Sequence, residues 1–201
     1  MPASTTPLPS LAIVTGASRG LGHALARALL VPGTRLLTMS RRATVLEAPA
    51  GAQHEDWQVD LADALPLAER LATWLRALPA SETRSAVFIH NAAMLSTPAP
   101  LAEVPPAELL QAARVNLEAP LLLSAAFLQA TAGAPGRRLM FVSSGLARTA
   151  MAGAASYCAT KAGLDHLARS LALEEAARTH GARVASVAPG VIDTDMQVQL
   201  R

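Results

Sequence analysis

The sequence has 201 residues, of which 51% are hydrophobic and 16% charged, and its formal net charge is +2. This length allows one domain with a sizeable core, and with so small a charge and no cluster of Lys and Arg among aromatic residues we expect no nucleic-acid partner. The one cysteine, Cys158, excludes an internal disulfide framework, and the five histidines lack the spacing of metal ligands. We therefore expect a globular protein without a metal site.

The first ten residues differ in composition from the rest. Residues 1–10 are rich in Pro, Ser and Thr and lack the positive start and apolar core of a signal peptide. No apolar run reaches the ~18 residues expected of a membrane span. We therefore expect residues 1–10 to be a disordered N-terminal lead, residues 11–201 to form a single domain, and the protein to be cytoplasmic without a membrane partner.

Short apolar runs alternate with segments of helical periodicity along residues 11–201. Strands are predicted at 11–15, 34–39, 55–59, 86–89, 138–142 and 183–187. Helices are predicted from the glycine-rich segment after residue 15 to Leu30, at 66–78, at about 105–131 with a kink at Pro120, and across Tyr157. Because the strands read as apolar throughout, this order predicts an α/β fold with a doubly wound parallel sheet covered on both faces, in three layers.

Polar residues follow several of the predicted strands directly. Ligands of parallel sheets bind beyond the carboxyl ends of the strands, so these residues are expected to share one edge of the sheet. They are Ser18, Arg41, Asp60, Asn91 and Ser144.

A glycine-rich turn follows the first strand, with Gly16, Gly20 and Gly22 leading into a helix. Such a turn lets the backbone approach a pyrophosphate, and the helix start supplies N–H groups and a positive dipole end. A tight turn with close helix packing is the alternative interpretation, since the spacing differs from the common dinucleotide-binding pattern.

The end of the second strand favours NADP(H). NAD-binding proteins usually place an acid there for the ribose 2′-hydroxyl, whereas an Arg accommodates the 2′-phosphate of NADP. This chain has Arg41 and Arg42 and no acid, and Arg19 in the glycine turn is near enough in such a fold to join them. Solvated loop charge is the alternative. Asp60, after the third strand, would accept from the adenine amino group or act as a helix N-cap.

Tyr157 and Lys161 lie at positions i and i+4 of a predicted helix and so share one face. An ammonium beside a phenol favours the phenolate and is expected to lower its pKa from about 10 toward neutrality. A Tyr tuned in this way could donate a proton to a carbonyl oxygen or take one from an alcohol. Alternatively, Tyr157 is a packing aromatic residue and Lys161 a solvated charge.

Taken together, these motifs resemble the classical short-chain dehydrogenase/reductase family, with its Rossmann-like fold, over nearly the whole chain. The residues in which the resemblance lies are the segment Thr15–Gly22, Asp60, Leu61, Asn91, Ala92, Asn116, Ser144, Tyr157, Lys161, Pro189 and Gly190. The segments 157–158, 171–175 and 188–197 are more similar to its sepiapterin reductase and benzil reductase branch.

The resemblance implies a catalytic set of Asn116, Ser144, Tyr157 and Lys161. Tyr157 would be the general acid/base, Lys161 would lower its pKa and hold the nicotinamide ribose, and Ser144 would bind the substrate carbonyl. Asn116 would hold a water in a proton relay behind Lys161. The implied NADP(H) contacts are Gly16, Ser18, Arg19, Gly20, Leu21, Gly22, Arg41, Asp60, Leu61, Asn91, Ala92, Tyr157, Lys161, Pro189, Gly190, Ile192 and Thr194.

Two departures from the family pattern stand out. His90 replaces the first Asn of the segment after the fourth strand and is expected to loosen a backbone contact there, while Ala93 replaces its last Gly. Members also usually continue past the Pro-Gly pair with a helical lid and a seventh strand, neither of which is found before Arg201. We therefore expect about six strands, with the sixth as an open edge.

The resemblance implies an NADPH-dependent carbonyl reductase, acting on a small ketone, a dicarbonyl or a pterin side chain. It also implies a homodimer or homotetramer that pairs through the helices at about 105–131 and 152–177. A non-catalytic dinucleotide-binding module and an NAD-dependent alcohol dehydrogenase are the alternatives. The intact catalytic set argues against the first, and Arg41 in place of an acid argues against the second.

Overall fold

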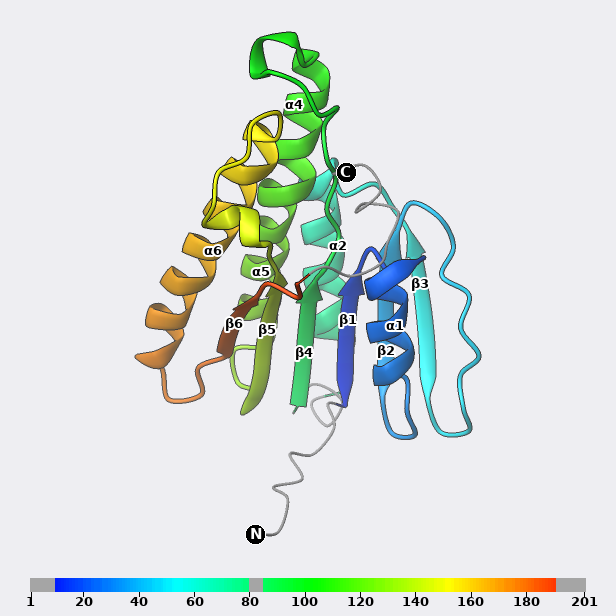
Figure 1. Cartoon of the computed structure of the whole chain (residues 1–201). Helices are drawn as coiled ribbons and strands as arrows, with labels where there is room; N and C mark the ends of the chain where they lie inside the picture. The colour runs from blue at the N-terminus through cyan, green and yellow to red at the C-terminus, as the bar shows by residue number, and fades with distance from the viewer. Residues whose placement is uncertain (1–9, 80–84, 191–201) are drawn as a thin grey trace, which may run out of the picture.

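Six parallel strands form a sheet at the centre of the computed structural model, which describes residues 10–79 and 85–190 (Figure 1). The strands lie in the order β3-β2-β1-β4-β5-β6. Their bounds are β1 Leu11–Thr15, β2 Arg35–Ser40, β3 Gln53–Gln58, β4 Ser85–His90, β5 Gly136–Val142 and β6 Arg183–Val187. The order reverses between β1 and β4, and this is the point at which ligands of open α/β sheets bind.

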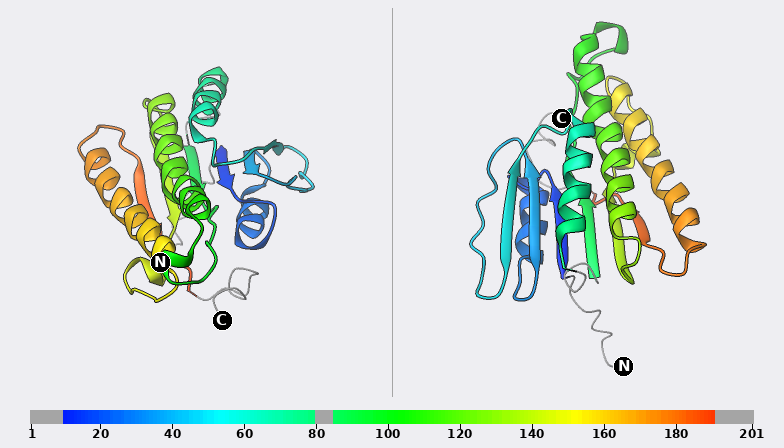
Figure 2. Two further views of the ribbon diagram at one scale, coloured as in Figure 1. Left: turned by 90° about the horizontal axis from the view of Figure 1, so that it is seen from above. Right: turned by 180° about the vertical axis from the view of Figure 1, so that it is seen from behind.

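Helices cover the sheet on both faces, which confirms the three-layer α/β fold. The helices are α1 Gly20–Leu29, α2 Ala64–Ala77, α4 Pro106–Ala113, α5 Ala119–Ala130 and α6 Ala155–Ala176, with the short segments η1 Leu101–Glu103, η2 Arg114–Glu118 and η3 Gly145–Ala147. Helices α2, α5 and α6 lie on one face and α1 on the other (Figure 2). None of the helices in the described ranges is long and apolar enough to cross a membrane.

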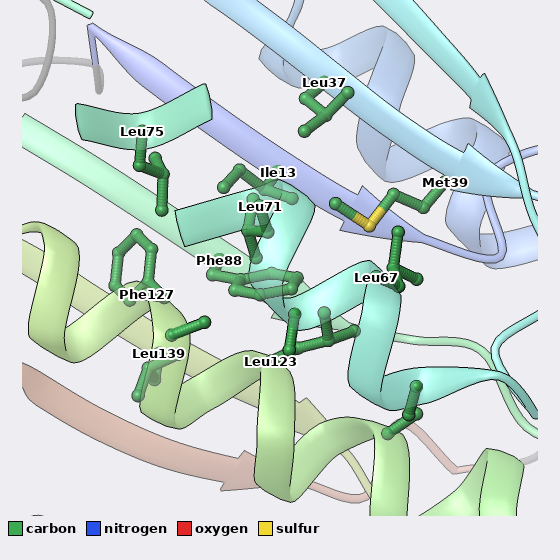
Figure 3. Packing of buried hydrophobic residues seen from close by; sticks show 14 of the residues in the cluster. Ile13, Leu37, Met39, Leu67, Leu71, Leu75, Phe88, Leu123, Phe127 and Leu139 are labelled. Atoms are coloured by element: carbon green, nitrogen blue, oxygen red, sulfur yellow. The ribbon is translucent and has the colours of Figure 1, made fainter. Parts of the chain in front are cut away.

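The main core lies between the sheet and the helices α2, α5 and α6 (Figure 3). Alternate residues of the strands point toward these helices, so Ile13, Leu37 and Phe88 share one layer with Leu71 and Phe127. A smaller cluster between α1 and the other face is built around Ala12, Val14 and Leu36 of β1 and β2. Burial on both faces explains why β1 reads as an uninterrupted apolar run.

The prediction that every strand is apolar throughout is wrong for β3. Its sequence is polar except for Trp57, and most of its residues are partly exposed. Strand β3 lies at the edge of the sheet and pairs with β2 alone within the described residues, so little of its surface needs to be apolar.

The predicted long helix at about 105–131 is interrupted. A π-helical segment, η2, separates α4 from α5, and the Ala119 N–H bonds the Arg114 carbonyl five residues back. Pro120 has no N–H with which to bond the Asn116 carbonyl in α-helical fashion, which accounts for the wider turn just before it. The irregularity is thus centred on Asn116 and precedes the proline.

Candidate functional site

The glycine turn and the end of β4 are joined at the switch point of the sheet. The Thr15 hydroxyl accepts the backbone N–H groups of Asn91 and Ala92, each at 3.1 Å. The Asn91 side-chain amide donates to the carbonyl oxygens of Thr15 and Gly16, at 3.0 and 3.2 Å. Asn91 was expected to contact NADP(H); its side-chain amide instead hydrogen-bonds the backbone of the glycine turn.

Backbone geometry requires the glycines of this turn. Gly16 and Gly20 have φ values of +68° and +56°, where L-residues with side chains are strained. A Cβ on Gly22 would lie 2.2 Å from the Gly16 carbonyl oxygen and 2.3 Å from Asn91 Nδ2. The N-cap residue of α1 is Arg19, whose guanidinium cannot accept a hydrogen bond from the first N–H groups of the helix. This cradle fits a dinucleotide pyrophosphate.

The segment with the basic residues lies beside the glycine turn. The Gly16 N–H donates to the Met39 carbonyl at 2.8 Å, and the Ser18 N–H donates to the Ser40 hydroxyl at 3.2 Å. Arg19 and Arg41 follow these two hydrogen-bonded segments, and both are exposed. The arrangement suits a phosphate contacted from two sides.

The remaining expected cofactor contacts lie at the same edge of the sheet. Asp60 is exposed and accepts the Ala62 N–H at 2.9 Å. Because α2 begins only at Ala64, the alternative in which Asp60 caps that helix is wrong. Leu61 is buried, and Gly190, after β6, has a φ of +78°. Ile192 and Thr194 lie outside the described residues.

Ser144, Tyr157 and Lys161 converge just beyond the end of β5. Ser144 follows that strand closely, and its hydroxyl is near enough to the Tyr157 phenol to favour the phenolate. Tyr157 and Lys161 are 5% and 2% exposed, and Lys161 Nζ lies 5.6 Å from the centre of the Tyr157 ring. The Lys161 ammonium donates to the Val142 carbonyl oxygen at 2.7 Å. The alternative in which Lys161 is a solvated charge is therefore wrong.

The expected lowering of the Tyr157 pKa is not observed. Burial raises the pKa of Tyr157 above its ordinary value, although the Ser144 hydrogen bond opposes this. Burial also lowers the pKa of Lys161 to about 8. Desolvation penalises the charged form of both groups. The four-residue spacing in the sequence indicates that the two side chains share a helix face, but it does not indicate how deeply they are buried.

Asn116 lies in η2 with its side chain fully engaged. Its amide oxygen accepts the Met94 N–H at 2.8 Å, and its Nδ2 donates to the Met94 carbonyl at 2.9 Å and to the Thr160 hydroxyl at 3.2 Å. The Thr160 hydroxyl in turn donates to the Tyr157 carbonyl at 3.0 Å. Thr160 was not predicted from the sequence, because only the packing of η2 against α6 brings the two side chains together.

His90 is buried in a contact that was not predicted from the sequence. Its Nε2 lies 2.9 Å from the Ser124 hydroxyl, and its ring stacks on Phe141 at a centroid distance of 4.9 Å. Burial lowers the pKa of His90 to about 3, so the ring is neutral. His90 thus joins β4 to α5 and β5 behind the site, where a loosened contact was expected.

Comparison with known proteins agrees with this geometry. The short chain dehydrogenase family matches residues 10–201. The chain is 32% identical over 192 residues to benzil reductase ((S)-benzoin forming) of Bacillus subtilis (strain 168), covering 95% of this chain and 78% of that protein. It is 36% identical over 203 residues to sepiapterin reductase of Mus musculus, covering 94% and 76%. Both names belong to the branch that the sequence resembles.

Solved structures support the same assignment. The crystal structure of a metagenomic short-chain oxidoreductase in complex with NADP is similar to this fold, with a TM-score of 0.77 and 34% identity, over 92% of this chain and 84% of that one. The motifs, the strand order and these similarities agree. The chain therefore belongs to the short-chain dehydrogenase/reductase family of oxidoreductases.

Proposed function

We propose that this protein is an NADPH-dependent carbonyl reductase that converts a small ketone, a dicarbonyl or a pterin side chain to an alcohol. The observation that supports this most strongly is the convergence of Ser144, Tyr157 and Lys161 at the end of β5, on the same edge of the parallel sheet as the glycine turn. A hydroxyl, a phenol and a buried ammonium, all able to donate a proton in a hydrogen bond, gather at one edge of the sheet. A module that only binds a dinucleotide has no need of them.

The glycine turn and the basic segment would bind the cofactor. The N–H groups at the start of α1 would face the pyrophosphate, with Gly16 and Gly22 allowing its close approach. Arg19 and Arg41 would contact the 2′-phosphate that distinguishes NADPH from NADH. The NADP complex of the metagenomic relative is consistent with this choice.

In the reductive direction, bound NADPH would supply the hydride to the carbonyl carbon. The Ser144 hydroxyl would hydrogen-bond the carbonyl oxygen and hold it near the phenol. Tyr157 would donate its proton to that oxygen as the C–O double bond becomes single. The ammonium of Lys161 would stabilise the phenolate left on Tyr157, whose proton is then replaced from solvent. Asn116, linked through Thr160 to the Tyr157 backbone, would keep α6 in register with this relay.

Cofactor preference is tested by fluorescence titration with NADPH and with NADH. The wild-type protein is expected to bind NADPH more tightly, and Arg41→Ala is expected to weaken NADPH about tenfold or more while leaving NADH unchanged, since a charge-assisted contact is lost. Arg27→Ala is the control, because Arg27 is equally exposed but lies in the last turn of α1, away from the glycine turn. Equal affinity for both dinucleotides would contradict the NADP(H) assignment.

Catalysis is tested with Tyr157→Phe in a screen of carbonyl substrates. The variant is expected to lose turnover and to retain cofactor binding, because only the phenolic hydroxyl group, which carries the acidic proton, is removed. A wild-type protein that binds NADPH but reduces no carbonyl would favour the non-catalytic module instead.

We further propose that the protein is a homodimer or homotetramer that pairs through α4, α5 and α6. Large apolar side chains on these helices are exposed, namely Leu110, Leu121 and Leu173. Light scattering of the purified protein would measure the mass, and a monomer at micromolar concentration would contradict this proposal.

A further inference from the structure

Asp165 is a buried carboxylate in the interior of α6, one turn after Lys161. It is 5% exposed, and its Oδ1 accepts the Ser186 hydroxyl of β6 at 2.5 Å. Its Oδ2 lies 3.7 Å from Arg148 Nε, a guanidinium that is largely exposed. A buried acid in the middle of a helix is costly unless neighbouring donors and charges compensate it.

The groups around Asp165 favour its charged form. The charged side chains near it are Lys161 and Arg169 on α6 and Arg148 after η3. The hydroxyls near it are those of Ser143, just after β5, and Ser186 on β6. The Ser143 hydroxyl favours the charged carboxylate although it forms no hydrogen bond of standard geometry. Burial acts to raise the pKa of Asp165, but these hydroxyls and guanidiniums outweigh it and the pKa is lowered.

Asp165 also places a buried negative charge one helical turn from Lys161. Desolvation lowers the pKa of Lys161 to about 8, and the negative charge of Asp165 opposes that decrease. Residues 157, 161 and 165 are spaced four apart and share one face of α6. Phenol, ammonium and carboxylate therefore follow one another along that face.

We propose that Asp165 is a positioning residue that keeps the Lys161 side chain charged while Nζ is held at the Val142 carbonyl oxygen. This inference deepens the proposed function, because a charged Lys161 is what would stabilise the Tyr157 phenolate. Without Asp165, a larger fraction of Lys161 would be a neutral amine near neutral pH, and that stabilisation would be lost.

Lys161 is the only lysine in the sequence, which allows a direct test without cofactor or substrate. Protein labelled with ε-¹³C-lysine gives one lysine resonance, whose chemical shift reports the ionisation of Lys161. The titration midpoint of the wild-type protein is expected near pH 8. The midpoint of Asp165→Asn is expected to be lower by roughly one pH unit, because an opposite charge one helical turn away is removed.

Two further variants separate charge from structure. Ser186→Ala keeps the carboxylate and removes its hydrogen bond, so its midpoint is expected to stay near that of the wild type. Asp165→Ser is a second, smaller neutral variant that replaces Asp165→Asn if the latter fails to fold by circular dichroism. An unchanged Lys161 midpoint in a folded neutral variant would overturn the proposal.

The catalytic consequence is measured as the pH profile of kcat/KM with a reducible carbonyl. The alkaline limb is expected to move to lower pH by the same roughly one unit in Asp165→Asn, which reduces kcat/KM at pH 8 about fivefold and leaves the value at pH 6 nearly unchanged. If Asp165→Asn shifts the titration midpoint of the Lys161 resonance but not the alkaline limb of the kcat/KM profile, the role of Asp165 in the reaction is overturned. A wild-type protein without turnover would contradict the proposed function. The titration of the Lys161 resonance would still show whether Asp165 keeps Lys161 charged, because it needs neither cofactor nor substrate.

Discussion

Tyr157 and Lys161 are the only tyrosine and the only lysine of this sequence, and they lie one turn apart on the same face of α6. The sequence has seventeen Lys and Arg residues, and the sixteen other than Lys161 are arginines. An arginine stays charged under all ordinary conditions, whereas burial can bring a lysine close to its titration point, as it does for Lys161. The ammonium at this position is thus chemically distinct from every other cation of the chain.

The single tyrosine makes the ionisation of Tyr157 directly measurable. Because burial raises the pKa of Tyr157 above 10.0, less than half of it is expected to be ionised at pH 10 in the folded protein without cofactor. Denaturant should release this effect and bring ionisation to about half. The near-ultraviolet absorbance of tyrosinate measures both states. Ser144→Ala should reduce ionisation of the folded protein further, since its hydrogen bond lowers the pKa; a folded protein already half ionised would contradict the expectation.

Gly22→Ala is expected to destabilise the protein, although alanine is the better helix former. The added Cβ would lie far inside contact distance of the Gly16 carbonyl and the Asn91 amide, so the glycine turn must move. We expect the free energy of unfolding in urea to fall by about 1–3 kcal/mol and dinucleotide binding to weaken. Gly133→Ala is the matched control, since a methyl group at that position would have open space within 4 Å. Equal unfolding midpoints for Gly22→Ala and wild type would disprove the clash.

The fold could be predicted well from the sequence because burial leaves a direct pattern. Strand β1 is covered on both faces, and its apolar run matched the observed strand residue for residue. Strand β3 was less well predicted, because an edge strand needs few apolar residues. The interruption at η2 was displaced from its predicted position, since a proline acts on the carbonyl four residues earlier.

The residues of the candidate site were predicted better from the sequence than their pKa shifts. Ser144, Tyr157 and Lys161 could be found because their spacing is distinctive. Thr160 and Asp165 could not, since their partners come from η2 and β6, which are distant in the sequence. The direction of the Tyr157 pKa shift depends on burial, which requires the packed structure.

His90 is expected to make the protein sensitive to acid. Its pKa is about 3 in the folded protein and 6.5 when exposed, so the unfolded chain binds the extra proton as the pH falls through 6.5. The contribution of His90 to the free energy of unfolding is therefore fully present above pH 6.5 and is lost progressively as the pH falls toward 3. Between pH 7 and pH 5 the loss should be about 2 kcal/mol. Urea unfolding of wild type and His90→Asn at both pH values measures it, because the other histidines contribute equally to the two proteins. An equal pH dependence would contradict a neutral, buried His90.

Arg137 and Glu175 form a buried ion pair that holds the end of α6 against β5. Arg137 Nη2 lies 3.0 Å from Glu175 Oε2, and the two side chains are 1% and 6% exposed. The same carboxylate oxygen accepts the Ala182 N–H at 2.7 Å, and Arg137 Nη2 also donates to the His180 carbonyl at 2.6 Å. The pair thus fixes the turn that leads into β6, the strand from which Ser186 contacts Asp165.

Glu175→Gln is expected to cost about 3–5 kcal/mol of unfolding free energy, because the isosteric amide leaves the Arg137 guanidinium buried without its counter-charge. Arg178→Ala provides the control: Arg178 Nε lies 3.7 Å from the other oxygen of Glu175 but its side chain is 59% exposed, so solvent screens the pair and its loss should cost less than about 1 kcal/mol. Urea unfolding of the three proteins measures the difference. If Glu175→Gln were no less stable than Arg178→Ala, the buried pair would not be what holds β6 in place, and the position of Ser186 beside Asp165 would need another explanation.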